Sequence, residues 1–322
     1  MLLDGDTLWP DLTALRWTLL ADPVDTDDGE PARLLLVRID SPRGELLDTA
    51  VFADLDELGL RLAASPEIRG VVVTGPRAGV FVPHFRLVEI AEGAEAIGRA
   101  LPWSAARAAY VSVAALARVP GVQDVLLSSP AAGLAELART HRALDRLGSL
   151  PQVVVAAVDG DALAGGCEIA LACDLRVMSR GDGRIGLVEV TAAIPPGAGG
   201  TQRLSRAVGP VRARSMMLRA VTLDADEAHT AGLVDEVCAS EDLLATALAL
   251  AAEVARRSPE AVLGVKRAVA GGRLWRHGVA REAAGFVSAA SGSRAIARIR
   301  RFDEESSADG RRTPWRDRTW LR

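Results

Sequence analysis

The stretch QVVVAAV at residues 152–158 constrains the fold of this 322-residue chain more than any other feature. A strand with one face in water alternates apolar and polar side chains, but here every position after Gln152 is apolar. The pattern therefore indicates a strand that is covered on both faces, as in a parallel sheet between layers of helices. The turn-forming sequence DGD follows at once and ends the strand.

Strands and helices alternate on both sides of this stretch. The runs RLLLVRI at 33–39 and IRGVVVT at 68–74 predict strands, because they are rich in leucine and β-branched residues. Between them, an apolar row at helical spacing predicts a helix: Val51, Leu55, Leu58 and Leu62. Further along, the pattern predicts a strand at 175–179 and helices at 166–173, 199–208, 211–219, 224–231 and 241–257. The fold class is therefore α/β, with a helix-rich C-terminal third.

Four segments are expected along the chain: an N-terminal extension (1–32), a core (33–237) with a helical insertion at about 91–138, a C-terminal helical region (238–302) and a tail (303–322). Three prolines are expected to break the insertion into several helices: Pro102, Pro120 and Pro130. The tail is polar and charged, so we expect it to be mobile unless a partner subunit holds it.

Composition excludes several classes of protein. With 49% hydrophobic residues the chain can bury a large core, and its net charge of −4 offers no general attraction to nucleic acid or to an anionic membrane. Cys167, Cys173 and Cys238 lack the spacing of zinc ligands and fit a reducing compartment, so no metal site is predicted. No apolar run is long enough to span a membrane, and the N-terminus lacks a secretory pattern. We therefore expect a cytoplasmic protein.

Glu168 stands in unusual surroundings in the stretch LAGGCEIALACDL at 163–175. Gly165 and Gly166 open a helix there, and the N–H groups of a helix N-terminus can hold a negative oxygen. A buried carboxylate is costly to ionise, so Glu168 either complements the helix dipole or has a chemical task. The glycines have a plain alternative too, which is tight packing of a helix on a strand.

Glu189 is a second glutamate among apolar residues, in RIGLVEVTAAIPPGAGGTQRL at 184–204. A proline- and glycine-rich loop follows it and leads into another helix. Two such glutamates, each beside a glycine-rich turn, suggest a pair of carboxylates that face one cavity and share acid and base duties. The alternative is that Glu189 is a salt-bridged loop residue.

Three stretches of the sequence together resemble a known family. From PQVVVAAVDGDALAGGCEIALACDLRVMS through GLVEVTAAIPPGAGGTQRLSRAVG to LDADEAHTAGLVDEV, it is similar to the crotonase superfamily of enoyl-coenzyme A hydratases and isomerases. The resemblance implies a spiral of ββα units with a C-terminal helical region that mediates trimers, often paired into hexamers. It also implies acyl-coenzyme A thioesters as substrates, with no further cofactor.

The resemblance gives roles to three residues. Gly165 matches one N–H donor of the family's oxyanion hole, which holds the enolate form of the thioester. Glu168 and Glu189 match the two glutamates that hold a water and add it across the double bond. Relatives that isomerise or decarboxylate commonly lack one of them, so their joint presence favours hydration. A catalytically silent relative that binds an acyl thioester or a partner is the alternative outside enzyme chemistry.

The pattern fails where the other oxyanion donor belongs, in VVVTGPRAGVFVPHFRLVEI. Phe81 matches the family, but Pro83 occupies the donor position and has no N–H, and His84 stands in place of a glycine. Three explanations compete: a shifted loop in which Val82 or His84 donates its N–H, a hydrogen bond from the His84 imidazole, or abandonment of enolate chemistry. We favour a contribution from His84.

Lys266 is the one lysine among the 38 basic residues of the chain. The family places a lysine in this helix near the nucleotide part of coenzyme A, where an ammonium meets phosphate, so Lys266 is the predicted coenzyme-binding residue. Chance survival of a surface lysine is the alternative. The insertion at about 91–138 lies over the acyl pocket in relatives, which suggests an unusual acyl group rather than straight-chain fatty acid oxidation; an insertion without effect is the alternative.

Overall fold

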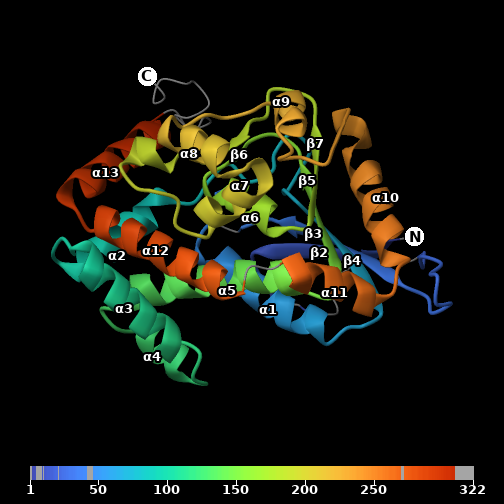
Figure 1. Cartoon of the computed structure of the whole chain (residues 1–322), viewed down its shortest axis with the longest axis horizontal. Helices are drawn as coiled ribbons and strands as arrows, with labels where there is room; N and C mark the ends of the chain where they lie inside the picture. The colour runs from blue at the N-terminus through green and yellow to red at the C-terminus, as the bar shows by residue number, and fades with distance from the viewer. Residues whose placement is uncertain are drawn as a thin grey trace. The chain divides into compact units, whose positions relative to one another are not determined.

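The computed structural model describes residues 2–4, 9, 11–20, 22–41, 46–269 and 272–308. The chain divides into two compact units, and each is described by itself. Unit 1 comprises Met1–His84, Arg142–Ile185 and Leu223–Gly271. Unit 2 comprises Phe85–His141, Gly186–Thr222 and Gly272–Arg322. Figure 1 labels many of the helices and strands of the two units.

Unit 1 is built on a sheet in the order β1-β2-β3-β4-β5-β7-β9. The strands are β1 (Leu2–Asp4), β2 (Leu15–Leu20), β3 (Arg33–Ile39), β4 (Ile68–Thr74), β5 (Val153–Val158), β7 (Leu175–Ser179) and β9 (Glu236–Cys238). The pairs from β3 to β9 are parallel, whereas β1 and β2 add antiparallel strands at one edge. The predicted strands 33–39, 68–74 and 175–179 and the α/β class are confirmed, and the strand predicted at 152–158 begins one residue later.

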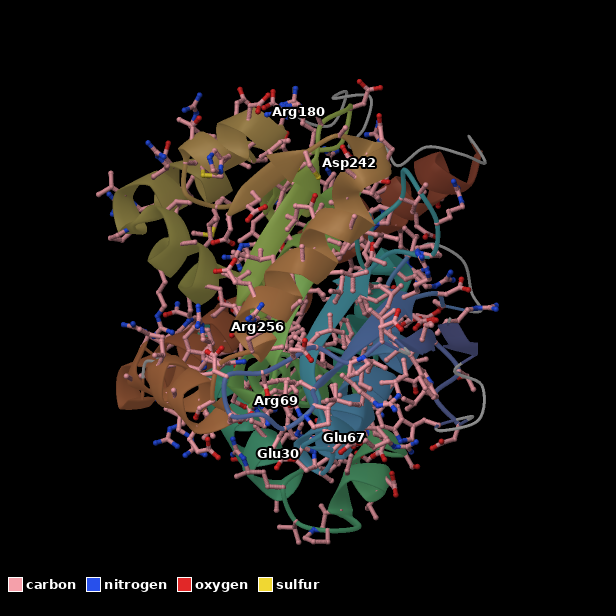
Figure 2. The ribbon with its side chains drawn as sticks, turned by 90° about the vertical axis from the view of Figure 1, so that its right-hand side faces the viewer. Glu30, Glu67, Arg69, Arg180, Asp242 and Arg256 are labelled. Atoms are coloured by element: carbon pink, nitrogen blue, oxygen red, sulfur yellow. The ribbon has the colours of Figure 1, made fainter. Side chains whose placement is uncertain are left out.

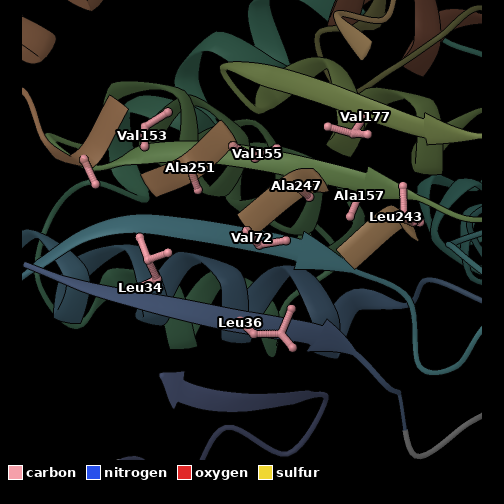
Figure 3. Close-up of a cluster of buried hydrophobic side chains, with 11 residues drawn as sticks. Leu34, Leu36, Val72, Val153, Val155, Ala157, Val177, Leu243, Ala247 and Ala251 are labelled. Atoms are coloured by element: carbon pink, nitrogen blue, oxygen red, sulfur yellow. The ribbon is translucent and has the colours of Figure 1, made fainter. Parts of the chain in front are cut away.

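β5 lies between β4 and β7, and all six of its residues are buried. Alternate residues Val153, Val155 and Ala157 pack against helix α10 (Leu243–Ala255), as Figure 3 shows. Val154, Ala156 and Val158 point to the opposite face and are fully buried as well. The sheet is therefore covered on both sides at β5, as the apolar run predicts.

Helix α10 presents small side chains to this sheet. Ala247, Ala251 and Ala255 are at most 2% exposed and lie at helical spacing toward the strands. Figure 2 shows Asp242 and Arg256 at opposite ends of α10, with Arg180, which follows β7, near the first end and Arg69 near the second. The helix thus runs opposite to the parallel strands, with an acidic residue at its N-terminus and a basic one at its C-terminus, which complements its dipole.

Further elements complete unit 1: β6 (Ala162–Leu163), β8 (Ile185–Gly186), whose last residue belongs to unit 2, and helices α1 (Thr49–Ala63), α6 (Gly165–Ala172), α9 (Ala225–Thr230), η3 (Ser240–Asp242) and α11 (Pro259–Val269). Asp48 caps α1 by accepting the Val51 N–H at 3.0 Å. The apolar row predicted for this helix is buried throughout. The sequence pattern therefore places both the start and the inner face of α1 correctly.

Unit 2 is helical. It contains α2 (Leu87–Ile97), α3 (Trp103–Leu116), α4 (Val122–Leu127), η2 (Glu189–Ala192), α7 (Gly200–Val208), α8 (Pro210–Leu218), α12 (Gly272–Ala290) and α13 (Ser293–Ala308). Helix α5 (Ala132–Ser149) begins in unit 2 and passes into unit 1 after His141. Val113 and Leu134 pack with Val287 of α12 in one apolar cluster. The helices predicted at 199–208, 211–219, 224–231 and 241–257 are present with ends shifted by at most two residues.

The predicted mobile tail begins inside a helix. Helix α13 runs to Ala308, so residues 303–308 continue it, and Phe302 just before them is 1% exposed. An apolar residue anchored in the core lets the helix extend into a polar segment, which composition alone does not reveal. Residues 309–322 of the predicted tail lie outside the described residues.

The packing of α10 makes a prediction about stability. Ala247→Leu should lower the free energy of unfolding by about 1–3 kcal/mol, because the added carbons have no room against the sheet. Ala249→Leu, on the exposed side of the same helix, is the control and should change stability by less than about 0.5 kcal/mol. Urea unfolding of both variants checks this, and equal losses would contradict the close packing.

Candidate active site

The loop that carries His84 runs beside the short strand β6. Val82 pairs with Ala162 in the parallel direction, and the Leu163 N–H donates to the Pro83 carbonyl at 3.0 Å. The His84 carbonyl in turn accepts the Leu47 N–H at 3.0 Å, and His84 is 2% exposed. The backbone around Pro83 is thus held on both sides: its carbonyl accepts a hydrogen bond, although the proline has no N–H to donate.

Helix α6 starts directly against this loop. A β-carbon built at Gly166 would lie 1.9 Å from the Val82 carbonyl oxygen, which is too close for any residue with a side chain. Gly166 therefore lets the loop approach the first turn of the helix. This glycine therefore serves tight packing, which was the alternative role given to the glycine pair.

Gly165 is the first residue of α6, and Ala164 before it is the N-cap. Ala164 adopts φ 46° and ψ −118°, a backbone region that favours glycine. The first N–H groups of a helix have no carbonyl acceptor inside the helix, so the Gly165 N–H suits an external negative oxygen. The strained residue turns the chain from β6 into the helix.

Glu168 lies in the first turn of α6 and is 4% exposed. Its N–H closes that turn by donating to the Ala164 carbonyl at 3.0 Å. Every residue of this helix is buried, so the carboxylate sits in apolar company close to the positive end of the helix dipole. The structure thus brings Gly165, Glu168 and the His84 loop together around the start of one helix.

Asp159, which the sequence pattern assigns only to a turn, fixes the other end of this loop. Its carboxylate accepts the Gly79 N–H at 2.7 Å and the Ser179 hydroxyl at 2.6 Å, and the Ser240 hydroxyl lies 3.0 Å away. These partners come from a loop, from β7 and from η3, far apart in sequence. A single carboxylate at the carboxyl end of β5 therefore anchors the segment that leads to His84.

Lys266 makes an ion pair and a hydrogen bond within unit 1. Its ammonium lies 2.7 Å from a carboxylate oxygen of Asp174 and donates to the Gln152 carbonyl at 2.9 Å. The lysine side chain is 10% exposed, so it is no chance surface residue. Burial raises the pKa of Asp174 above its ordinary value, and the neighbouring Lys266 opposes that rise. A coenzyme phosphate at this lysine would share it with Asp174.

Glu189 belongs to unit 2, where it begins the short helix η2 and is 6% exposed. The Ile194 N–H donates to the Glu189 carbonyl at 3.3 Å, and Ala193 turns the chain with φ 61°. Arg298 of α13 donates to the Thr191 carbonyl at 3.0 Å. The turn that carries Glu189 is thus held from within and by a neighbouring helix.

A model of the family described as enoyl-CoA hydratase/isomerase matches residues 131–277, the part that contains Gly165, Glu168 and Glu189. Over this segment the chain is similar to the hydratases and isomerases of the crotonase superfamily. The 2,3-dehydroadipyl-CoA hydratase of Escherichia coli (strain K12) is 46% identical over 124 residues, which are 38% of this chain and 48% of that protein. A short-chain-enoyl-CoA hydratase of Clostridium acetobutylicum is 43% identical over 129 residues, 40% of this chain and 49% of its own length. The chain thus spans about half the length of the curated relatives it matches.

Solved structures agree on the fold. A Bacillus anthracis enoyl-CoA hydratase is 25% identical with a TM-score of 0.58, over 92% of this chain and 96% of that one. The human mitochondrial delta3-delta2-enoyl-CoA isomerase is 22% identical with a TM-score of 0.66, over 91% of this chain and 99% of its own, and shows the fold alone. Within the described residues, no helix has the length and apolar character to cross a membrane, and no group of three or more acidic, histidine or cysteine side chains could hold a metal ion.

The strain at Ala164 makes a second prediction. Ala164→Gly should raise the free energy of unfolding by about 1 kcal/mol, because glycine adopts a positive φ without the clash of a β-carbon. Ala170→Gly in the middle of α6 is the control and should lower it by about 1 kcal/mol. Thermal unfolding checks both variants, and a loss of stability in Ala164→Gly would contradict the strain.

A third prediction concerns Lys266 and pH. Lys266→Met leaves the Asp174 carboxylate buried without its ammonium, which should cost about 3 kcal/mol at pH 7.5. The raised pKa of Asp174 means that its charge lowers stability progressively as the pH rises through that pKa, and without Lys266 the pKa rises further. The loss should therefore be smaller at pH 5 than at pH 7.5.

Urea unfolding at the two pH values measures this difference. Arg267→Met, at an exposed position next along α11, is the matched control and should change little at either pH. Equal losses for Lys266→Met at both values would show that Asp174 does not carry the effect.

Proposed function

We propose that this chain catalyses the reversible hydration of an enoyl-coenzyme A thioester. One observation carries the proposal: the buried Glu168 lies in the first turn of a helix whose leading N–H belongs to Gly165, inside the segment that the family model matches. The names of the two hydratases that are 46% and 43% identical over this segment support it. The hydratase lyase reaction uses coenzyme A as part of the substrate and needs no further cofactor.

In this proposal the Gly165 N–H donates to the thioester oxygen. Addition of water to C3 of the double bond pushes electrons toward that oxygen, and a donor aimed at it stabilises the resulting enolate. One glutamate of the pair Glu168 and Glu189 takes a proton from the attacking water, and the other delivers a proton to C2. Atoms balance, because the product contains the substrate plus one water.

His84 supplies the second donor in this proposal. Pro83 has no N–H, and its carbonyl is bound by Leu163. His84 follows it directly and offers both a backbone N–H and a ring N–H. Hydrogen bonds hold the loop on each side of Pro83, which suits a donor in a fixed position and argues against a loop that has lost its catalytic role. Loss of one oxyanion donor typically costs about 100- to 1,000-fold in turnover. His84→Ala removes the ring N–H and keeps the backbone N–H, so a loss in this range assigns the second donor to the ring, and turnover close to the wild type assigns it to the backbone.

The test is hydration of crotonyl-coenzyme A and of a panel of branched and aromatic enoyl thioesters. Enoyl absorbance should fall while mass spectrometry shows the gain of one water. Glu168→Gln and Glu189→Gln should each lower kcat by about 100-fold or more, because an amide neither accepts nor delivers the proton. Glu241→Gln, at an exposed position in η3, is the control and should keep full activity.

A variant with both glutamates replaced tests whether they act on the same substrate. If both carboxylates serve one substrate, Glu168→Gln with Glu189→Gln should lose about as much as the worse single variant. Losses that multiply would mean that the two glutamates act independently. Thioesters that bind to the wild-type protein and never change would contradict the proposed reaction and favour a silent binding protein.

Isomerisation of the double bond, or decarboxylation through the same enolate, is the second candidate reaction. A relative named enoyl-CoA isomerase/hydratase, from Mycosarcoma maydis, is 39% identical over 129 residues. Isomerisation moves the double bond without a change of mass, and decarboxylation loses carbon dioxide, so product analysis separates both from hydration.

We further propose that the protein acts in the cytoplasm as a homotrimer or a pair of trimers. Exposed apolar side chains on α8 and α11, among them Leu218 at 70% and Val269 at 75%, would be covered in such an assembly. Lys266 of α11 is proposed to meet the coenzyme phosphate, which favours free coenzyme A over a carrier protein. Light scattering of the purified protein gives the oligomeric state.

A further inference from the structure

One face of helix α12 holds the loop between Glu189 and α7. Gly278, Glu282, Gly285 and Phe286 recur at the spacing of one helical face. A β-carbon at Gly197 of the loop would lie 2.5 Å from the Phe286 ring, and one at Gly285 would lie 3.8 Å from Pro195. Loop and helix are therefore in close contact, and all of these residues belong to unit 2.

Glu282 makes the polar contact on this face. Its carboxylate accepts the N–H of Gly199, the N–H of Thr201 at 2.9 Å and the Thr201 hydroxyl. Helix α7 starts at Gly200 and has Gly199 as its N-cap, with no capping side chain of its own. A carboxylate from another helix thus caps α7, where the helix dipole also favours a negative charge.

Glu282 also lies close to a buried histidine. His141 Nε2 lies 3.8 Å from a Glu282 oxygen, and the Glu282 side chain is 1% exposed. The Nδ1 of the same ring lies 3.1 Å from the Tyr110 hydroxyl and 2.9 Å from the Leu137 carbonyl. The carboxylate is therefore enclosed between the start of α7 and an imidazole that α3 and α5 hold in place.

We propose that Glu282 is a positioning residue that fixes the loop from Glu189 to Thr201 and thereby sets the place of the Glu189 carboxylate. The loop is held near its start by Arg298 on Thr191, in its middle by Phe286 against Gly197, and at its end by Glu282. Of these contacts, Glu282 alone is a buried charge. The proposal rests on the proposed function, because it gives Glu189 a chemical role.

Glu282→Gln is the variant that tests it. An amide offers one oxygen, and its NH2 group would face an N–H donor of the loop, so at least one of the two backbone bonds is lost. A small misplacement of a catalytic group costs about 100-fold in rate, so kcat should fall by about 10- to 100-fold. KM should stay within about twofold of the wild-type value, because the variant leaves unchanged the binding energy that the ground state and the transition state share.

Glu95→Gln is the matched control. Glu95 is also a glutamate of unit 2 that pairs with an arginine of a packed helix, Arg300, at 2.8 Å, but it lies on the surface. It should keep kcat within about twofold, as expected for an exposed ion pair. Thr201→Val removes only the hydroxyl donor and should lower kcat by about tenfold at most. This milder variant carries the test if Glu282→Gln does not fold.

Hydrogen exchange of the backbone gives a readout that does not need activity. Peptides covering residues 189–203 should exchange faster in Glu282→Gln, and to a lesser degree in Thr201→Val, whereas Glu95→Gln should match the wild type. The pH profile of kcat should change in Glu282→Gln and stay unchanged in Glu95→Gln, because a displaced Glu189 titrates in new surroundings. A merely structural residue would lower stability without moving that profile.

The outcomes separate the two proposals. Faster exchange together with a lower kcat and an altered pH profile supports the positioning role. Unchanged exchange overturns it, and so does faster exchange with unchanged kcat. A wild-type protein that transforms no thioester contradicts the proposed function, whereas the exchange data still decide whether Glu282 fixes the loop.

Discussion

The close approach of the Val82 carbonyl to Gly166 is the constraint on which the candidate active site depends. With 1.9 Å between that oxygen and any β-carbon at position 166, only glycine lets the loop meet the first turn of α6. The contact brings the backbone around Pro83 to the helix start, where the Gly165 N–H suits a negative oxygen. Strain at Ala164 and the anchoring of Gly79 by Asp159 serve the same arrangement.

Two buried carboxylates hold loop backbone in place of taking part in the proposed chemistry. Asp159 in unit 1 and Glu282 in unit 2 each accept a backbone N–H of a loop that carries a candidate site residue. Hydrogen bonds to an ionised group are stronger than neutral ones, and burial removes the competing water. Each loop therefore gains a fixed shape from one side chain that is distant in sequence.

Local pattern predicts the main strands and helices correctly and nominates candidate site residues, but it misses the contacts that hold those residues in place. The apolar run at 153–158 and the row at Val51 to Leu62 lead to the correct strand and helix, because burial imposes a period on neighbouring residues. Glu168 stands out as a charge in apolar company. The roles of Asp159 and Glu282, and the pairing of Lys266 with Asp174, depend on partners far along the chain. One signal was available for Glu282: α7 starts at glycine without a capping side chain, so a distant acceptor was needed.

In the proposed reaction, the start of α6 donates a hydrogen bond to the thioester oxygen. Carbon-13 NMR of butanoyl-coenzyme A labelled at the thioester carbonyl tests it most directly, because this saturated analogue has no double bond that can be hydrated. We expect a downfield shift of the carbonyl resonance on binding, since hydrogen bonds to the oxygen draw electrons away from the carbon. A thioester that binds with its carbonyl resonance unchanged from free solution would contradict it.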